Sequence, residues 1–207
     1  MGDGADRRSD ILNKTIEYYE KNARKFIEET LHADMRDMRG DFLSRIAKGG
    51  RILDLGCGSG RDGKAFLDAG YAVVLVDGSQ EMCKAAAALC GQESVCSTFA
   101  EYAPQGSFDG IWACASLLHL SREVVRSVVK KLMASLQPGG CFYMSFKYGD
   151  FSGERNGRFF TDLTEVSLQD VLLGLNDVER VESRITLDVR PGRAAEKWLN
   201  VYLMKRR

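Results

Sequence analysis

The distribution of apolar residues divides the chain into a central region and two flanks. From residue 51 to residue 146, short apolar runs typical of buried strands alternate with segments whose apolar residues recur at helical spacing. The predicted strands cover residues 51–55, 71–76, 95–99, 108–114 and 141–146, and the predicted helices cover residues 62–69, 79–89 and 121–136. This alternation is typical of βαβ units, so these strands are expected to run parallel in one sheet.

The flanks carry different patterns. Helical spacing predicts helices over residues 10–31 and 35–47, and another over residues 164–173 after an arginine- and glycine-rich loop at 147–162. Two last strands are predicted over residues 178–189 and 198–204, and their connection is too short to hold a helix, which makes this pair antiparallel. The predicted fold is α/β: a Rossmann-like, doubly wound, seven-stranded sheet, mostly parallel, with one antiparallel edge strand and helices on both faces.

Composition narrows the class of protein. The chain has 207 residues, of which 44% are hydrophobic and 28% charged, and this length favours one domain. Lysine plus arginine and aspartate plus glutamate both number 29, so the basic excess typical of proteins that bind nucleic acid or anionic membranes is missing. The six cysteines form no C-x-x-C pair and no apolar run approaches ~18 residues, which predicts a cytoplasmic protein with reduced thiols and no metal site.

Three segments are expected to meet at the carboxyl ends of the strands, where open α/β sheets bind their ligands. Asp54–Gly60 is a glycine-rich loop between a strand and a helix, which lets the backbone approach a ligand closely. Asp77 ends the next strand, about 20 positions further on, where an acidic residue accepts hydrogen bonds from ribose hydroxyls. Phe99–Glu101 follows the third strand, where a base edge can lie. Together they predict an adenosine-type nucleoside.

The glycine loop also distinguishes between cofactors. The dinucleotide fingerprint G-x-G-x-x-G needs a third glycine where Arg61 stands, and no Gly-Lys-Ser/Thr of a Walker A motif follows the loop. Asp54, two positions before the first glycine, suits a cationic amino group and would repel a pyrophosphate. S-adenosylmethionine is therefore preferred over a nicotinamide cofactor.

Four segments resemble motifs of the class I S-adenosylmethionine-dependent methyltransferases. Ile52–Asp62 resembles the first motif, Val76–Met82 the second, Phe108–Leu120 the fourth, and Leu136–Gly140 the turn before the fifth strand. The resemblance covers about residues 15–147 and is nearest to small bacterial methyltransferases grouped with those of tellurite resistance. It implies that S-adenosylmethionine is the cofactor and S-adenosylhomocysteine the product. It also implies one domain over residues 1–207, with a helical cap (1–48), a cofactor-binding core (49–147), and a substrate loop with C-terminal strands (148–207).

The resemblance further implies roles toward the cofactor for individual residues. Asp54 orients the amino group, Asp77 takes the ribose hydroxyls, and Gly56, Cys57 and Gly58 line the methionine and ribose. Gly78 and Met82 flank the adenine, Phe99 offers its backbone N–H with Ala100 beside it, and Cys114 or Ala113 offers a carbonyl to the amino group. The predicted cofactor contacts also include Arg61 and Tyr19, which lies on the helix that caps the pocket.

One segment departs from the family pattern. An aspartate that binds the adenine amine often follows the third strand, whereas the chain has Thr98–Glu101 there. Recognition of adenine by backbone groups and recognition by Glu101 both stay open.

The acceptor side of the site is predicted from charge and position. His119 follows the fourth strand and is the candidate catalytic base, since imidazole titrates near neutral pH. Tyr148, Arg155, Arg158 and Arg190 are the candidate substrate-binding residues, because planar guanidinium groups suit a carboxylate or phosphate.

These observations predict methyl transfer by in-line displacement to a small acceptor, which the arginines suggest is anionic. Two alternatives remain: methylation of RNA, such as tRNA, or of protein, and a non-catalytic module that binds S-adenosylmethionine. The expected partner is a small molecule and not a membrane, nucleic acid stays open as the alternative partner, and the chain can be a monomer or a homodimer.

Overall fold

A computed structural model describes residues 3–207, with side chains from residue 13 onward. The helices are α1 (Asp3–Thr30), α2 (Arg36–Leu43), α3 (Arg61–Asp68), α4 (Gln80–Cys90), α5 (Arg122–Ser135) and α6 (Glu165–Leu172), with a 3₁₀ turn, η1, at Leu117–His119. The strands are β1 (Arg51–Leu55), β2 (Ala72–Asp77), β3 (Ser94–Cys96), β4 (Phe108–Ala113), β5 (Leu136–Lys147), β6 (Ser152–Arg155), β7 (Arg158–Thr161), β8 (Val178–Leu187) and β9 (Lys197–Lys205).

The predicted α/β fold is confirmed. Seven strands form one sheet in the order β3-β2-β1-β4-β5-β9-β8, and β1 to β5 pair in parallel. The reversed strand β9 pairs antiparallel with both β5 and β8, so it lies one position inside the edge that β8 forms. Among the helices that the structure describes, none is both long and apolar enough to cross a membrane.

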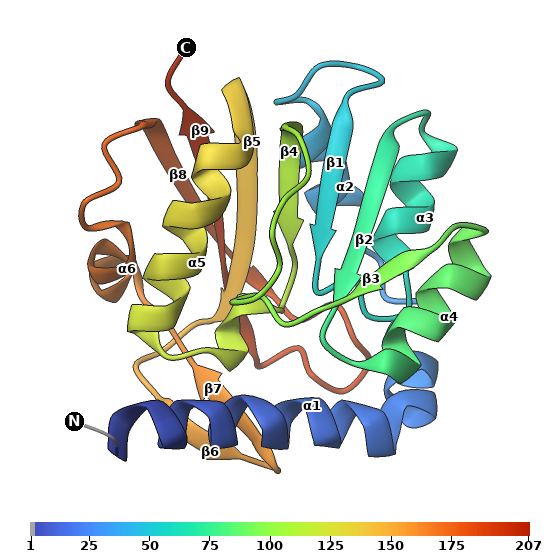
Figure 1. Ribbon diagram of the computed structural model, residues 1–207, viewed down its shortest axis with the longest axis vertical. Coiled ribbons are helices and arrows are strands. Elements are labelled where there is room, and N and C mark those ends of the chain that lie inside the picture. Colours follow the sequence, from blue (N-terminus) through green and yellow to red (C-terminus); the bar gives the residue numbers. More distant parts are fainter. Residues whose placement is uncertain (1–2) are drawn as a thin grey trace.

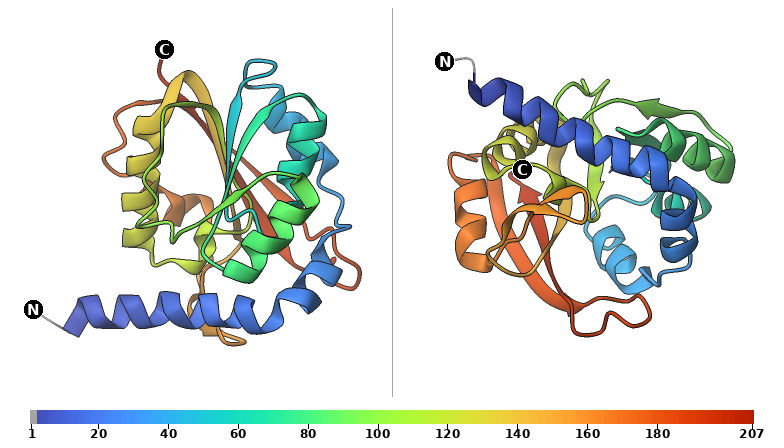
Figure 2. Two further views of the ribbon diagram at one scale, coloured as in Figure 1. Left: turned by 45° about the vertical axis from the view of Figure 1, so that its right-hand side comes forward. Right: turned by 90° about the horizontal axis from the view of Figure 1, so that it is seen from below.

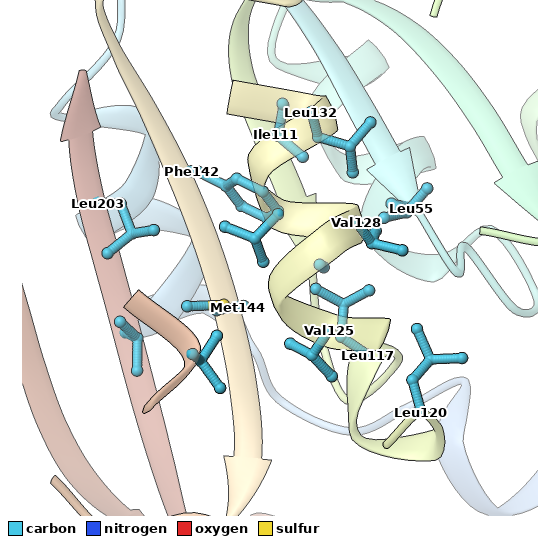
Figure 3. Close-up of a cluster of buried hydrophobic side chains, with 14 of the residues drawn as sticks. Leu55, Ile111, Leu117, Leu120, Val125, Val128, Leu132, Phe142, Met144 and Leu203 are labelled. Atoms are coloured by element: carbon cyan, nitrogen blue, oxygen red, sulfur yellow. The ribbon is translucent and has the colours of Figure 1, made fainter. Parts of the chain in front are cut away.

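Side-chain alternation along the strands places a core on each face of the sheet. Leu53 and Leu55 of β1 point to the face covered by α5 and α6, whereas Ile52 points to the face covered by α2 and α3. On the first face, Val125 and Val128 of α5 lie against strand residues such as Ile111 and Phe142, shown in Figure 3. Each such side chain, fully buried, contributes about 1.5–3 kcal/mol to the free energy of unfolding.

The second face is more aromatic. The rings of Trp112 and Tyr143, from β4 and β5, stack at a centroid distance of 4.0 Å. Phe42 of α2 and Phe66 of α3 cover the Trp112 ring at 5.2 Å and 5.5 Å. Helix α2 is therefore part of the core that supports β4.

One end of the sheet is covered by segments from outside the central βαβ units. Helix α1 crosses beneath the carboxyl ends of the parallel strands, with the β6–β7 hairpin beside it, in all views of Figures 1 and 2. Phe159 N–H of β7 donates to the Thr15 hydroxyl of α1 at 3.2 Å, which ties the two segments together. The end of the sheet where a ligand is expected is therefore roofed.

Three predicted boundaries were wrong. The predicted loop 147–162 contains the β6–β7 hairpin, because Asn156 and Gly157 adopt φ of 53° and 74° and form the two-residue turn that Asn-Gly favours. Helix α1 begins at Asp3 rather than at residue 10, and β5 begins at Leu136 rather than at residue 141. Leu136 already pairs with Phe108 of β4, so Pro138 and Gly139 lie within a strand instead of separating two elements.

Candidate functional site

A cavity of about 810 Å³ lies between the carboxyl ends of the parallel strands, α1, the β6–β7 hairpin and the β8–β9 connection. Most of the predicted site residues line it: Tyr19, Asp54, Gly56, Cys57, Gly58, Arg61, Asp77, Gly78, Met82, Phe99, Cys114, His119, Tyr148, Arg155, Arg158 and Arg190. The predicted cofactor side and the predicted acceptor side therefore form one continuous pocket.

The glycine loop needs glycine for two different reasons. Gly56 has φ of 77°, and a Cβ there would lie 2.3 Å from Cβ of Ser116, so packing against the turn after β4 excludes any side chain. Gly58 has φ of 54°, but a Cβ there would meet nothing within 4 Å. Because Gly58 lines the cavity, the open space beside it is space that a ligand can fill.

The turn after β4 forms the opposite wall of this loop. Ala115 has φ of 51°, a left-handed conformation that is uncommon for a residue other than glycine, and its N–H donates to the Ser145 hydroxyl at 2.8 Å. This turn presents Cys114 to the cavity, where burial raises the pKa of its thiol to about 12. The thiol is therefore neutral at physiological pH. The role predicted for Cys114 uses its backbone carbonyl and does not need the thiol.

Asp77 joins the glycine loop to the start of α4. Its Oδ2 accepts from Gly58 N–H and its Oδ1 from Ser79 N–H, both at 2.9 Å. Burial raises the pKa of this carboxyl, although these backbone N–H groups favour the charged form. A carboxylate has about four lone-pair positions. Each oxygen therefore keeps capacity for one more donor, which fits a pair of ribose hydroxyls.

Asp54, at the end of β1, is a buried carboxylate with an unpaired oxygen. The residue is 2% exposed, and its Oδ2 has no hydrogen-bond partner. Burial, followed by the negative charge of Asp62, raises the pKa of Asp54 well above its usual value. A cationic group nearby would favour the ionised form of Asp54, so this carboxyl fits the amino group of S-adenosylmethionine.

This fit gives a pH-dependent prediction. A ligand ammonium favours ionised Asp54, so a carboxyl that is protonated in the free protein must release its proton on binding. We expect the affinity for S-adenosylhomocysteine to rise with pH, by up to about tenfold per pH unit, until Asp54 is ionised in the free protein. Calorimetry in buffers of different ionisation enthalpy measures this proton release. Asp54→Asn should remove the pH dependence, and an equal dependence in both proteins would contradict the assignment.

Asp62, on the first turn of α3, is a buried site residue that the sequence analysis did not assign. It is 5% exposed and accepts from Arg61 through Nε (3.0 Å) and Nη2 (2.7 Å), from Arg39 (2.7 Å) and from the Trp112 indole (3.0 Å). Arg61 also donates to the Thr30 carbonyl of α1 at 3.1 Å. The predicted cofactor residue Arg61 is therefore held in an ion-pair network that joins α1, α2 and α3.

Only some of the residues predicted to lie near the adenine line the cavity. Phe99 and Thr98 line the cavity, whereas Ala100 lies outside it, beside a separate shallow hollow on α5. The ammonium of Lys131 on α5 binds the backbone carbonyls of this turn at 2.8–2.9 Å, that of Ala100 included, and draws the turn toward α5. Glu101 accepts from the Thr98 hydroxyl at 2.7 Å and does not line the cavity. Ala100 and Glu101 thus lie outside the cavity in this structure, and their contacts with adenine stay predictions.

His119 occupies the roof of the pocket but both its ring nitrogens are engaged. Nδ1 lies 2.7 Å from the Phe159 carbonyl oxygen, and Nε2 lies 2.8 Å from the Tyr19 hydroxyl. Burial lowers the pKa of His119 to about 4, and the nearby charge of Arg158 acts in the same direction. The predicted base is therefore a neutral imidazole that faces Tyr19 rather than open space.

The predicted acceptor-binding arginines differ in their partners. Arg155 pairs with Asp162 at 2.9 Å, and Arg190 pairs with Asp188 through two guanidinium nitrogens. Arg158 has no carboxylate partner among the described residues, and its Nε is buried without a hydrogen-bond partner. Its guanidinium carbon lies 4.3 Å from the centroid of the Tyr18 ring. Among the three predicted acceptor arginines, Arg158 is therefore the one whose charge is left for a ligand.

The fourth predicted acceptor residue, Tyr148, leaves β5 at the same end of the sheet. It lines the cavity, and a hydrogen bond with Glu165 at the start of α6 raises the pKa of its hydroxyl. The signals that the sequence analysis missed are local ones. The Asn156-Gly157 turn marks the hairpin that carries Arg155 and Arg158, and the acidic residues two to seven positions from Arg155 and Arg190 mark their ion pairs.

Comparisons with known proteins agree with this geometry. Residues 52–140 match a family model described as a methyltransferase domain, and no curated protein sequence matches the chain. The fold is similar to that of 1,6-didemethyltoxoflavin-N1-methyltransferase from Burkholderia thailandensis, solved with S-adenosylhomocysteine (TM-score 0.73, 22% identity, covering 96% of this chain and 89% of that one).

Two further solved structures show the same fold. TehB from Haemophilus influenzae has a TM-score of 0.67 and 16% identity, covering 87% of this chain and 66% of that one. Magnesium protoporphyrin IX methyltransferase from Synechocystis PCC 6803, solved with S-adenosylmethionine, has a TM-score of 0.64 and 16% identity, covering 92% of this chain and 96% of that one. The nearer resemblance to the tellurite-resistance group stays a prediction, because likeness at such identity concerns the fold alone.

Proposed function

We propose that the chain is a class I S-adenosylmethionine-dependent methyltransferase and that it methylates a small molecule that presents a carboxylate or another anionic group to Arg158. The proposal includes the roles given above to Asp54 and Asp77 on the cofactor side. It also takes the acceptor to lie between Tyr19 of α1 and the β6–β7 hairpin.

The observation that carries this proposal is the guanidinium of Arg158, which has no carboxylate partner among the side chains described from residue 13 onward and lies in the same cavity as the glycine loop. Three aromatic rings surround it, those of Tyr18, Tyr19 and Phe160, at 4.3, 5.7 and 5.2 Å. A cation held by rings in a partly enclosed cavity attracts an anion more strongly than one on an open surface. A roofed cavity also favours a small molecule over a macromolecular surface.

The chain's own groups then position the reactants. S-adenosylmethionine, when bound, supplies a methyl carbon that the sulfonium makes electrophilic, and transfer is an in-line displacement. Asp54, Asp77 and the glycine loop fix one reactant, and Arg158 fixes the anionic group of the other. Helix α1 and the hairpin cover the pocket on one side. Holding two reactants in line in this way contributes a large part of the rate enhancement in such reactions.

The substrate class can be tested without knowing the acceptor. The protein is incubated with S-adenosylmethionine carrying a labelled methyl group and a cell extract separated into small molecules, RNA and protein. We expect label in the small-molecule fraction and its retention on an anion-exchange resin. Label in RNA or protein would support a macromolecular acceptor instead, and label in no fraction would support a binding module without transfer. Either result would overturn the proposal.

Arg158 gives a sharper prediction. Arg158→Met should raise the extract concentration that gives the half-maximal rate by about 10–100-fold, because a hydrogen-bonded charge pair contributes about 1.5–3 kcal/mol. Affinity for S-adenosylhomocysteine, measured by calorimetry, should change less than threefold. Arg24→Met, on the exposed face of α1, is the matched control and should change neither quantity. If Arg158→Met lowered the affinity for the cofactor as much as that for the acceptor, Arg158 would not be a specific contact of the acceptor.

A further inference from the structure

We propose that Tyr19 is the acid–base residue that contacts the acceptor, and that His119 acts through it as a positioning residue that receives its proton. This inference rests on the proposed function and adds that the reacting atom of the acceptor carries a hydrogen, as an O–H or N–H group. It replaces direct action by His119, whose two ring nitrogens are both engaged within the protein.

The hydrogen bonds of this cluster have only one consistent direction. The Phe159 carbonyl can only accept, so His119 Nδ1 must donate to it at 2.7 Å. A neutral imidazole then has a bare Nε2, which accepts from the Tyr19 hydroxyl at 2.8 Å. Arg158 Nη1 can only donate, and it lies 3.3 Å from the same hydroxyl oxygen. The Tyr19 oxygen therefore donates its proton to His119, accepts from Arg158, and keeps one lone pair for a ligand.

Tyr19 lies where the two reactants are expected to meet. It lines the cavity, and its hydroxyl is under the electrostatic influence of Arg158 on the acceptor side and of Asp77 on the cofactor side. His119 is 7% exposed and is covered by the ring of Phe160, whose centroid is 4.9 Å from that of the imidazole. Although His119 lines the cavity, its Nε2 is occupied by the Tyr19 hydroxyl, so an acceptor exchanges a proton with that nitrogen through Tyr19.

The proton balance of the reaction follows from this arrangement. As the acceptor atom forms its bond to the methyl carbon, the bond between that carbon and sulfur breaks and its electron pair stays on sulfur. The acceptor's own hydrogen passes as a proton to the Tyr19 oxygen, and the Tyr19 proton passes to His119 Nε2. One positive charge leaves sulfur and one appears on the imidazolium, so the net charge of the pocket does not change.

The electrostatic environment sets the pKa values of His119 and Tyr19, and a bound anionic acceptor would change them. Burial lowers the pKa of His119 to about 4, with Arg158 acting in the same direction, so the ring is neutral and free to accept a proton at physiological pH. Burial also raises the pKa of Tyr19, which keeps its proton on the hydroxyl when the pocket is empty of acceptor. The other ionisable groups that act on Tyr19 are Asp77 and Tyr18. An anion paired with Arg158 would cancel the effect of Arg158 and make His119 a stronger base.

A purely structural cluster would have the same distances but different consequences. The bond between Thr15 and Phe159 N–H also ties α1 to the hairpin, so loss of one hydroxyl from Tyr19 leaves that tie in place. If the cluster is only structural, Tyr19→Phe should lower the stability of the protein and leave the pH dependence of the rate unchanged. If the cluster is a relay, the substitution should lower the rate at saturating substrate and change its pH dependence.

The test uses Tyr19→Phe and His119→Gln, with Tyr71→Phe and His32→Gln as matched controls that do not line the cavity. Both relay variants should lower the rate of label transfer to small molecules by about 100-fold or more, with the affinity for S-adenosylhomocysteine within threefold of wild type. Glutamine can accept the Tyr19 hydrogen bond but cannot take its proton, so a wild-type rate in His119→Gln would overturn the relay. The wild-type rate should rise with pH to a plateau, and the residual rate of each variant should lack that rise.

A readout independent of turnover separates this inference from the proposed function. In protein labelled with ¹⁵N-histidine and saturated with S-adenosylhomocysteine, His119 should carry its proton on Nδ1, and Tyr19→Phe should shift the Nε2 resonance. A proton on Nε2, or an unshifted resonance, would overturn the relay even if label reached small molecules. Wild-type protein that labels no small molecule would instead defeat the proposed function, and the relay as a catalytic device with it, whatever the resonances show.

Discussion

Replacing Asp62 with alanine is expected to lower the free energy of unfolding by about 3–5 kcal/mol, because it leaves two partly buried guanidinium groups and the buried Trp112 indole N–H without their acceptor. Asp62 is 5% exposed and pairs with Arg39 and Arg61, both at 2.7 Å, while the Trp112 indole donates to it at 3.0 Å. Chemical denaturation monitored by circular dichroism measures this loss. Asp62→Asn, which keeps the shape but not the charge, should lose less.

The matched control for this prediction is Asp170→Ala. Asp170 pairs with Arg122 at 3.7 Å on the surface, so its loss should change the free energy of unfolding by less than about 1 kcal/mol. Comparable losses in the two variants would mean that the buried network contributes no more than a surface pair.

Acid should weaken the wild type through the same residue. Burial acts to raise the pKa of Asp62, but Arg61 and Arg39 outweigh it, so the pKa lies below its usual value of 3.8. A carboxyl with a lowered folded-state pKa contributes stability that is complete above its unfolded value and is lost as the pH falls through the folded value. The difference in unfolding free energy between wild type and Asp62→Ala should therefore shrink below about pH 4.

The sheet could be predicted from sequence because burial on both faces gives its parallel strands continuous apolar runs. Helix α4 could be placed from its ends: the Ser79 hydroxyl accepts from Met82 N–H as an N-cap, and Gly91 ends the helix at φ of 69°. The start of β5 could not be placed in the same way. Pro138 and Gly139 are strong turn signals locally, but pairing between Leu136 and Phe108 is a long-range contact that no local pattern records.

The site was predictable as far as backbone position determines it. Asp54 lies near the end of β1, the glycine loop follows that strand, and Asp77 ends β2. Parallel strands end at one edge of the sheet, so the sequence alone brings these residues together. Which arginine remains without a carboxylate depends on partners across the pocket, and that is a property of the folded chain. Arg155 and Arg158 are three positions apart, yet only Arg155 is paired with Asp162.

Asp77→Ala is expected to lower the affinity for S-adenosylhomocysteine by about 100-fold or more. Each hydrogen bond between a hydroxyl and a carboxylate contributes about 1.5–3 kcal/mol, and the two oxygens of Asp77 have capacity for one ribose hydroxyl each. Asp77→Asn keeps one of its two acceptor oxygens, so its affinity should fall between those of wild type and Asp77→Ala. Isothermal titration calorimetry measures all three, and an unchanged affinity in Asp77→Ala would contradict the ribose assignment.

The same substitution also removes structure, so binding and folding must be separated. Asp77 holds the N–H groups of Gly58 and Ser79, and their loss should cost about 1–3 kcal/mol of unfolding free energy. Thr164→Ala is the matched control, because it removes the N-cap of α6, a similar loss, at a residue that does not line the cavity. If Thr164→Ala binds S-adenosylhomocysteine as wild type does while Asp77→Ala does not, the lost affinity belongs to the carboxylate and not to reduced stability. Equal losses in the two variants would instead assign Asp77 a structural role alone.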